Sequence, residues 1–214
     1  MLIFLKDENE EWERHEGSLT DLKSALDKRN ISIGDRASIG DWASIGDWAS
    51  IGDWARIGAG ARIGAGARIG DWASIGDWAR IGAGARIGDW ARIGDWARIG
   101  AGARIGAGAS IGAGARIEKT YDALVVGPIG SRNAYTTFFR SKEGIAVNCG
   151  CWAGMIAEFR QRVTDTHKGN AHEIVYLAAC DYAEAVILNA KVTIAAFEPR
   201  TPRKPDVPEN DGGI

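Results

Sequence analysis

The side chains best suited to chemistry gather in the last third of the chain. Cys149 and Cys151 are two residues apart on a predicted strand, so both thiols should point to one face, and His167 and His172 follow them. Cysteine sulfur and histidine nitrogen are the usual ligands of zinc in proteins. The Cys-x-Cys spacing is tighter than that of the usual zinc knuckle, however, and cysteine is often simply buried. We therefore treat these four residues as metal candidates but predict neither a metal nor any other cofactor.

The composition places the chain among ordinary globular proteins and excludes several functional classes. Its 214 residues carry 26 basic and 28 acidic side chains, a net charge of −2, which argues against a protein that holds nucleic acid on a basic surface. Three cysteines are too few for a disulfide-built fold. No apolar stretch reaches the roughly 18 residues that span a membrane. The composition thus predicts a cytoplasmic protein with reduced thiols that binds neither nucleic acid nor membrane.

The element that must position all other features is a repeat of six residues. An Ile occupies every sixth position from Ile33 to Ile117, in fourteen units of the form Ile-Gly-Asp-Trp-Ala-Ser/Arg or Ile-Gly-Ala-Gly-Ala-Ser/Arg. A helix is excluded, because a Gly in each unit would cost it about 1 kcal/mol every time. In a strand, Ala and Ile share the inner face while Ser or Arg points outward, and the Gly after Ile is expected to supply the positive φ of a corner. Three units make a coil of 18 residues, so the sequence predicts about 4.7 coils of a parallel β-helix.

This repeat resembles the hexapeptide-repeat family, whose left-handed parallel β-helix is shared by many bacterial acyltransferases and is typically trimeric. The matching pattern, aliphatic-Gly-x-x-small-x, covers about 40% of the chain. The resemblance implies a His as general base in a cleft between coils, often beside an extruded loop. No His lies between His15 and His167 and no loop interrupts the units, so that base has no matching residue. The three-His metal site of the hexapeptide carbonic anhydrases is missing for the same reason.

Stacking residue n on residue n + 18 predicts what the outside of the β-helix displays. Exposed Trp beside Arg is typical of interface centres. The corners are therefore expected to be buried between protomers or stacked on one another under Arg caps, or alternatively to form a ladder for the sugar rings of a glycan. One bare corner, Gly66 with Gly84 and Gly102, is a candidate trimer contact. The residues predicted to serve binding or a subunit interface are Trp42, Trp54, Trp72, Trp78, Trp90, Trp96, Arg62, Arg80 and Arg98.

The outward Arg rows are expected to form a solvated face whose charge is offset by corner Asp side chains. A stripe that binds an anionic polymer and a contact between subunits are the alternatives.

The two ends are expected to close the β-helix. Residues 1–32 should form a cap of two short strands and a helix that starts at a capping box, Ser18 to Asp21. Residues 118–198 should form an α+β module with strands at 123–126, 135–140 and 144–151 and helices at 154–167 and 170–190. The tail at 199–214 is Pro-rich and predicted to be disordered. The module resembles the ends of uncharacterised hexapeptide proteins of bacterial and prophage genomes in Gly130-Ser-Arg-Asn133, Tyr135-Thr-Thr137, Cys149-Gly-Cys151 and Thr166-His167.

From these features the sequence predicts a mainly β protein that is not an enzyme. Its repeats at 33–117 would form a rigid, homotrimeric spacer that displays the C-terminal module, in the cytoplasm or, if phage-derived, in a virion. Two alternatives stay open, a glycan-binding protein that uses the Trp corners and a hexapeptide acyltransferase.

Overall fold

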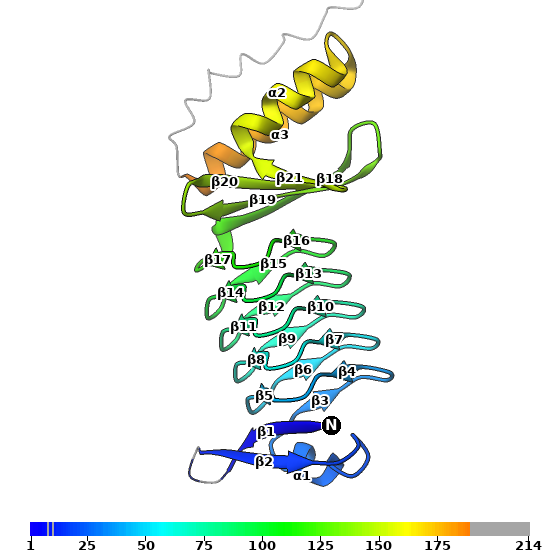
Figure 1. Cartoon of the computed structure of the whole chain (residues 1–214), viewed down its shortest axis with the longest axis vertical. Coiled ribbons are helices and arrows are strands. Elements are labelled where there is room, and N and C mark those ends of the chain that lie inside the picture. The colour runs from blue at the N-terminus through cyan, green and yellow to red at the C-terminus, as the bar shows by residue number, and fades with distance from the viewer. Residues whose placement is uncertain (8, 10, 189–214) are drawn as a thin grey trace, which may run out of the picture.

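A computed structural model describes residues 1–7, 9 and 11–188, which form a column of three stacked parts (Figure 1). An N-terminal cap, a parallel β-helix and a C-terminal module follow one another along the long axis. The predicted tail and the end of the predicted last helix lie outside the described residues. None of the described helices is both long and apolar enough to cross a membrane.

Short strands, each separated from the next by a corner, build the β-helix. Each strand up to β14 pairs in parallel with the strand 18 residues further on, as Ile57 does with Ile75 and Ile75 with Ile93. The result is three sheets, with strand orders β17-β14-β11-β8-β5-β1-β2, β16-β13-β10-β7-β4 and β15-β12-β9-β6-β3, and the predicted 18-residue coil is confirmed. The strands are β3 (Ser32–Ile33), β4 (Ser38–Ile39), β5 (Ala43–Ile45), β6 (Ser50–Ile51), β7 (Arg56–Ile57), β8 (Arg62–Ile63), β9 (Arg68–Ile69), β10 (Ser74–Ile75), β11 (Arg80–Ile81), β12 (Arg86–Ile87), β13 (Arg92–Ile93), β14 (Arg98–Ile99), β15 (Arg104–Ile105), β16 (Ser110–Ile111) and β17 (Arg116–Ile117).

Two residue types fill the interior of the β-helix. The Ile of each unit is buried from Ile39 to Ile117, and the Ala that precedes each strand is buried from Ala37 to Ala109. The Ser or Arg between them points outward, as the two-residue period of a strand requires. Each buried Ile contributes roughly 1.5–3 kcal/mol. A core of identical layers therefore suffices for stability, which is why the sequence can repeat itself.

The corners are turned by a different residue from the one expected. Positive φ falls on the fourth position of the unit, where Trp54 has φ 58° and Gly66 has φ 65°, and not on the Gly that follows Ile. That Gly is needed for close packing between coils. A Cβ atom at Gly64 would lie 2.5 Å from the backbone nitrogen of Ala83 in the next coil, closer than atoms can approach.

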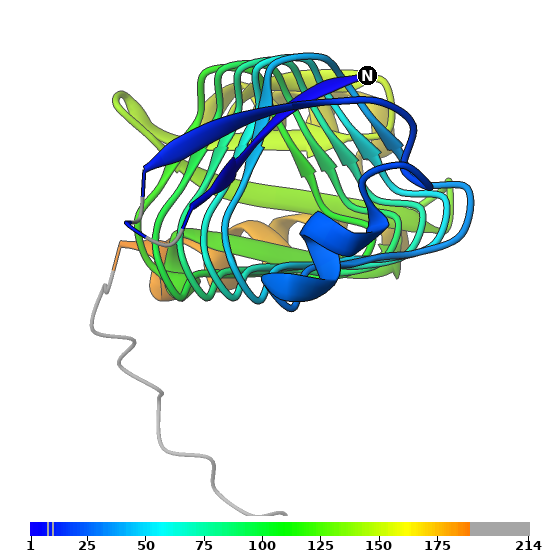
Figure 2. The ribbon, with the colours of Figure 1, turned by 90° about the horizontal axis from the view of Figure 1, so that it is seen from below.

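The N-terminal cap closes one end of the β-helix (Figure 2). It consists of β1 (Leu2–Lys6), β2 (Trp12–Glu16) and α1 (Lys23–Lys28). Strand β1 continues one of the three sheets, because it pairs in parallel with β5 and antiparallel with β2. Ser18 and Asp21 form the reciprocal hydrogen bonds of the predicted capping box, but they do so in the turn before α1. The helix is therefore shorter than expected.

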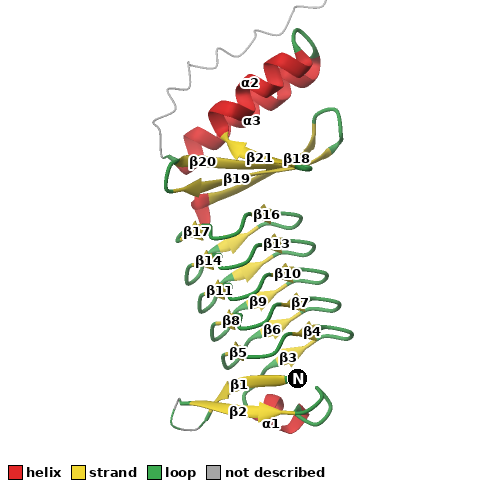
Figure 3. Cartoon of the chain, in the orientation of Figure 1, coloured by secondary structure: helices red, strands yellow, loops and turns green. Residues whose placement is uncertain are grey.

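The C-terminal module is a four-stranded antiparallel sheet covered on its far face by two helices (Figure 3). The prediction of three strands was wrong by one. Trp152–Met155 pairs with the preceding strand instead of opening the helix. The Asn170 side chain accepts hydrogen bonds from the backbone of His172 and Glu173 and so caps the last helix, as predicted. The elements are η1 (Thr120–Asp122), β18 (Ala123–Ile129), β19 (Ala134–Ser141), β20 (Gly144–Cys149), β21 (Trp152–Met155), α2 (Ile156–His167) and α3 (Ala171–Ile187).

Strand β19 joins the module to the β-helix. The consecutive residues Phe138 and Phe139 of this strand point to opposite faces of the sheet. Phe139 packs into the Ile and Ala core, and Phe138 packs into the core under the helices. Backbone groups of the last coil also find partners in the sheet. Ser110 donates its N–H to Thr137 Oγ1 at 2.9 Å and accepts from Asn148 Nδ2 at 2.8 Å. The sheet thus covers the open strand edges of the last coil.

Candidate functional site

The Trp side chains of the repeats stand at the corners and stack on one another. Ring centroids of Trp54 and Trp72 lie 4.7 Å apart at 7°, and those of Trp72 and Trp90 lie 5.0 Å apart at 1°. Trp78 and Trp96 form a second stack at 5.6 Å. Both faces of Trp72 are therefore occupied by neighbouring rings, so a sugar ring could not stack on Trp72 itself.

An arginine closes the first stack at its N-terminal end. The Arg36 guanidinium lies 4.5 Å from the Trp54 ring, within the range of a cation–π contact. Trp42 instead packs on Phe4 of the cap, with ring centroids 6.0 Å apart. All seven repeat Trp side chains are exposed in this single chain, so the residues predicted for an interface are free to meet a partner.

Five of the corner Asp side chains bond to the backbone of the preceding coil, namely Asp53, Asp71, Asp77, Asp89 and Asp95. Asp53 Oδ1 accepts from the Asp35 N–H at 2.8 Å, and Asp71 Oδ1 accepts from the Asp53 N–H at 2.9 Å. Among the residues that the structure describes, no ion pair joins a repeat Asp to a repeat Arg. The row of Arg62, Arg80 and Arg98 is therefore exposed, and its positive charge is balanced by the Asp carboxylates without direct contact.

The four metal candidates lie close together in the C-terminal module. Cys149, Cys151 and His167 line a cavity of about 210 Å³, and the His172 ring packs edge-on against His167 at 5.6 Å. Cys149 ends β20 and Cys151 lies in the following turn, so the two thiols meet at a bend and not along a strand. Within the described ranges no three His, Cys, Asp or Glu side chains are placed to hold a metal. These residues therefore carry no metal proposal.

The surroundings of the thiols include two residues that the sequence did not single out. Arg132 Nη1 lies 3.6 Å from Cys151 Sγ, and Tyr176 Oη lies 4.0 Å from Cys149 Sγ. Burial raises the pKa of Tyr176, and the nearby Cys149 raises it further. Cys180 lies in the core of the module, where burial raises the pKa of its thiol to about 11.

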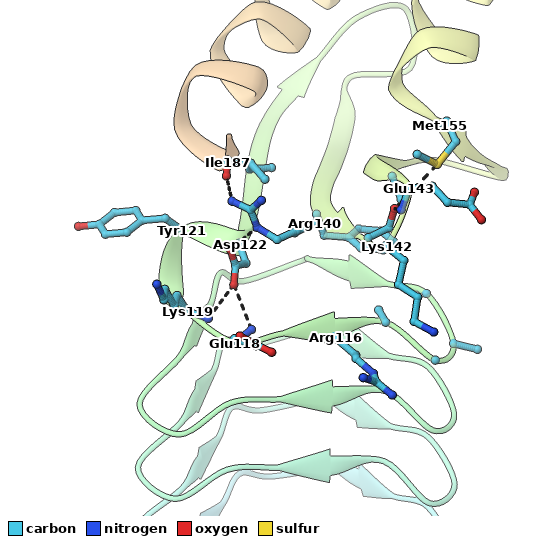
Figure 4. Close-up of a pocket in the computed structure, with 17 residues that line it drawn as sticks. Arg116, Glu118, Lys119, Tyr121, Asp122, Arg140, Lys142, Glu143, Met155 and Ile187 are labelled. Carbon is cyan, nitrogen blue, oxygen red and sulfur yellow. Dashed lines mark hydrogen bonds and ion pairs between the residues drawn. The ribbon is translucent and has the colours of Figure 1, made fainter. Parts of the chain in front are cut away.

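A larger cavity of about 690 Å³, here called the junction pocket, lies between the last coil and the C-terminal sheet (Figure 4). Apolar side chains of Phe139, Met155 and Ile187 form part of its wall. Its cationic side chains are Arg116, Lys119, Arg140 and Lys142, and its acidic ones are Glu118, Asp122 and Glu143. The pocket therefore combines an apolar wall with charged groups from two separate segments, 116–122 and 140–143.

Asp122 organises one side of the junction pocket. Its Oδ1 accepts from Arg140 Nε at 2.7 Å, and its Oδ2 accepts from the N–H groups of Lys119 and Glu118 at 2.9 and 3.1 Å. Arg140 also donates to the Ile187 carbonyl at the end of α3. Burial alone would raise the pKa of Asp122, but these hydrogen bonds outweigh it and hold that pKa below its ordinary value. The carboxylate thus ties the last coil, the sheet and α3 together.

A family model described as bacterial transferase hexapeptide (six repeats) matches residues 30–65, 55–89 and 84–119. The three matches together cover the repeats of the solenoid and less than half of the chain. This confirms the resemblance drawn from the six-residue pattern. A comparison with curated proteins gives no match.

Solved structures similar to the chain include three described as acetyltransferases. Perosamine N-acetyltransferase from Caulobacter crescentus, in complex with CoA and GDP-perosamine, is 28% identical over 42% of this chain and 43% of its own, with a TM-score of 0.42. The acetyltransferase domain of PglB from Neisseria gonorrhoeae is 24% identical over 42% and 47%, with a TM-score of 0.22. A putative acetyltransferase from Bacillus cereus is 16% identical over 88% and 98%, with a TM-score of 0.25. The chain spans less than half the length of the first two.

These findings correct one expectation. The sequence argued against an enzyme because the repeats contain no His. The family model that matches the repeats is described as one of bacterial transferases. The prediction that the protein is not an enzyme is therefore contradicted.

Proposed function

We propose that the protein is a hexapeptide acyltransferase whose junction pocket binds the acyl donor. The repeats match a transferase family, and the observation that carries the proposal is the make-up of this pocket. It is large enough for a small-molecule ligand and places cationic side chains around an apolar wall.

An acyl donor of the CoA type carries both features that the pocket would recognise, negatively charged phosphates and an acyl group. Arg140 is already held by Asp122. In the part of the chain that the structure describes, Arg116 and Lys142 form no ion pair, so both are available for phosphate oxygens. Phe139 and Met155 would contact the acyl group.

Transfer also needs a group that takes a proton from the acceptor amine or hydroxyl. No His lines the pocket. Asp122 is committed to Arg140 and two backbone N–H groups, which leaves the carboxylates of Glu118 and Glu143. We assign the general base to this pair.

The proposal includes a homotrimer that meets at the bare corner. A side-chain atom added at Gly66, Gly84 or Gly102 would find nothing within 4 Å, so the backbone of another protomer can approach closely. The exposed Arg62, Arg80 and Arg98 side chains flank this corner. Sedimentation velocity at several concentrations tests the assembly, and a species of monomer mass throughout would contradict it.

The donor site is tested by calorimetric titration with acetyl-CoA and by release of free CoA in the presence of amine and hydroxyl acceptors. Arg116→Ala and Lys142→Ala should each weaken binding about tenfold, because each removes a charge-assisted hydrogen bond. Arg92→Ala is the matched control, since Arg92 is also an exposed repeat arginine but lies in another sheet, away from the bare corner, and does not line the pocket. Absence of binding, or equal binding by all three variants, would contradict the proposal.

A further inference from the structure

The Cys-Gly-Cys turn of the C-terminal module holds two thiols at one cavity. Cys149 pairs with Trp152 at the end of the hairpin, and Gly150 bends the chain between the cysteines with φ 62°. Two Cα–Cα steps of about 3.8 Å bent at that Gly keep the cysteine Cα atoms within the roughly 4.4–6.8 Å that a disulfide requires. The separation of the two Cα atoms is therefore compatible with a disulfide between Cys149 and Cys151.

The two thiols have different surroundings. Cys151 is exposed, and Arg132 Nη1 lies 3.6 Å from its sulfur. Cys149 is half-buried, accepts a hydrogen bond from Thr136 Oγ1 at 3.3 Å and lies beside Tyr176. Nucleophilic thiols are found in partly exposed surroundings beside Arg, Lys or His. The surroundings of Cys151 thus suit the thiol that attacks first. Those of Cys149 suit the second thiol, which resolves the mixed disulfide formed on Cys151.

The cavity in front of these thiols suits a small anion. Arg132, Arg162 and His167 line it together with the hydroxyls of Ser131 and Thr166, and no Asp or Glu of the described residues lines it. Its remaining wall is formed by the side chains of Trp152, Phe159, Val163 and Tyr176. Arg132 also lies directly over the bend, since a Cβ atom at Gly150 would be 2.9 Å from its Nη1. A ligand carboxylate held by the two guanidiniums would lie next to Cys151.

We propose that the Cys-Gly-Cys turn is a thiol–disulfide exchange centre for small disulfides that carry carboxylates. The Cys151 thiolate attacks one sulfur of the small disulfide, a new S–S bond forms, and the other half leaves as a thiolate. The Cys149 thiolate then attacks Cys151 Sγ, which forms the Cys149–Cys151 disulfide and releases the second half. The protein loses two electrons and two protons, and the small disulfide gains both as two thiols. This activity is separate from acyl transfer at the junction pocket.

The test uses the reduced full-length protein with two probes of opposite charge, glutathione disulfide and cystamine. Intact mass and peptide mapping should show a Cys149–Cys151 disulfide and two released glutathione molecules, while the buried Cys180 stays reduced. Glutathione disulfide should react at least about tenfold faster than cystamine, a difference of about 1.4 kcal/mol in activation free energy. Arg132→Gln should lower that ratio, with circular dichroism confirming that the variant folds.

Two further variants assign the order of attack. Cys149→Ser should accumulate a mixed disulfide on Cys151, and Cys151→Ser should not react at Cys149. The proposal is overturned if cystamine reacts as fast as glutathione disulfide, if the wild-type mixed disulfide persists without closing, or if Cys149 reacts equally well alone. None of these results depends on whether the protein binds acetyl-CoA.

Discussion

The β-helix between Ser32 and Ile117 and the module between Thr120 and Ile187 hold their cores together in different ways. The β-helix buries Ile and Ala in identical layers, each bonded to the layer 18 residues away. The core of the module does not repeat and is made of different residue types. Within it the Phe159 ring contacts the rings of Phe138 and Tyr176 edge-on. A repeated layer admits only side chains that suit every coil. The chemically distinctive groups, all three Cys and two of the three His, accordingly lie in the module.

Phe138→Ala should have the largest effect and should separate the two regions. Phe138 is fully buried, and removal of such a ring costs about 3–5 kcal/mol. Because the core under the helices is distinct from the Ile and Ala core, hydrogen exchange measured by mass spectrometry should rise over 123–187 but not over 39–99. Ile75→Ala is the control, with the reverse pattern. Equal increases over the whole chain would mean that the regions unfold as one.

Gly64→Ala should destabilise the β-helix more than Gly66→Ala, although the two sites are two residues apart. A Cβ atom at Gly64 would strike the backbone of the next coil, whereas one at Gly66 meets nothing within 4 Å. Overpacking costs about 1–3 kcal/mol, and the positive φ at Gly66 about 1–2 kcal/mol. Urea unfolding midpoints compare them. The reverse order would show that conformation, and not coil packing, requires the glycines.

Asp122→Asn should destabilise the joint between the regions by about 1.5–3 kcal/mol, the range for hydrogen bonds to charged groups. Because the folded-state pKa of Asp122 is lowered, its stabilisation is complete above the ordinary value of about 3.9 and is lost as the pH falls through the folded value. The difference in unfolding midpoint between wild type and variant should therefore shrink below about pH 4. Asp181→Asn is the control, because its partner Arg160 keeps Glu184. A constant difference at all pH values would contradict this role.

Trp72→Ala should have the smallest effect. It removes two exposed stacking contacts worth about 0.5–1.5 kcal/mol each when well formed, so a loss of about 1 kcal/mol is expected, together with the circular dichroism signal of coupled indoles. Trp48→Ala, which removes a Trp with no stacked ring among the described residues, should leave both unchanged. An equal loss in both variants would show that the stacks do not stabilise the corners.

The periodic region was largely predictable from sequence, because one spacing determines every contact in it. The Ile and Ala core and the columns n to n + 18 followed directly, and the stacking of Trp54, Trp72 and Trp90 was one of the alternatives that those columns left open. The position of the positive φ within the unit could not be predicted, because Trp, which often occupies that position, is rarely found in this conformation. Only the distance between coils shows that the Gly after Ile is required for packing.

The cavities were not predictable, because residues far apart in the sequence form them. Arg116, Arg140 and Ile187 meet at the junction pocket only when the sheet covers the last coil. The grouping of Cys149, Cys151 and His167 was anticipated, but Arg132 enters from the turn between β18 and β19 and Tyr176 from α3. A turn residue and a single aromatic on a helix give no sequence signal of such a meeting.

Because the coil has three sides, the number of repeat units determines both the length of the β-helix and the rotation of the C-terminal module about its axis. Duplicating 18 residues would lift the C-terminal module by about 4.8 Å, the spacing of paired strands, and keep every column aligned. Duplicating six would rotate the module by one third of a turn and shift Trp, Asp and bare corners into one another's columns. Near-identical repeats recombine readily, so related chains should differ in length mainly by whole coils, with the two ends unchanged.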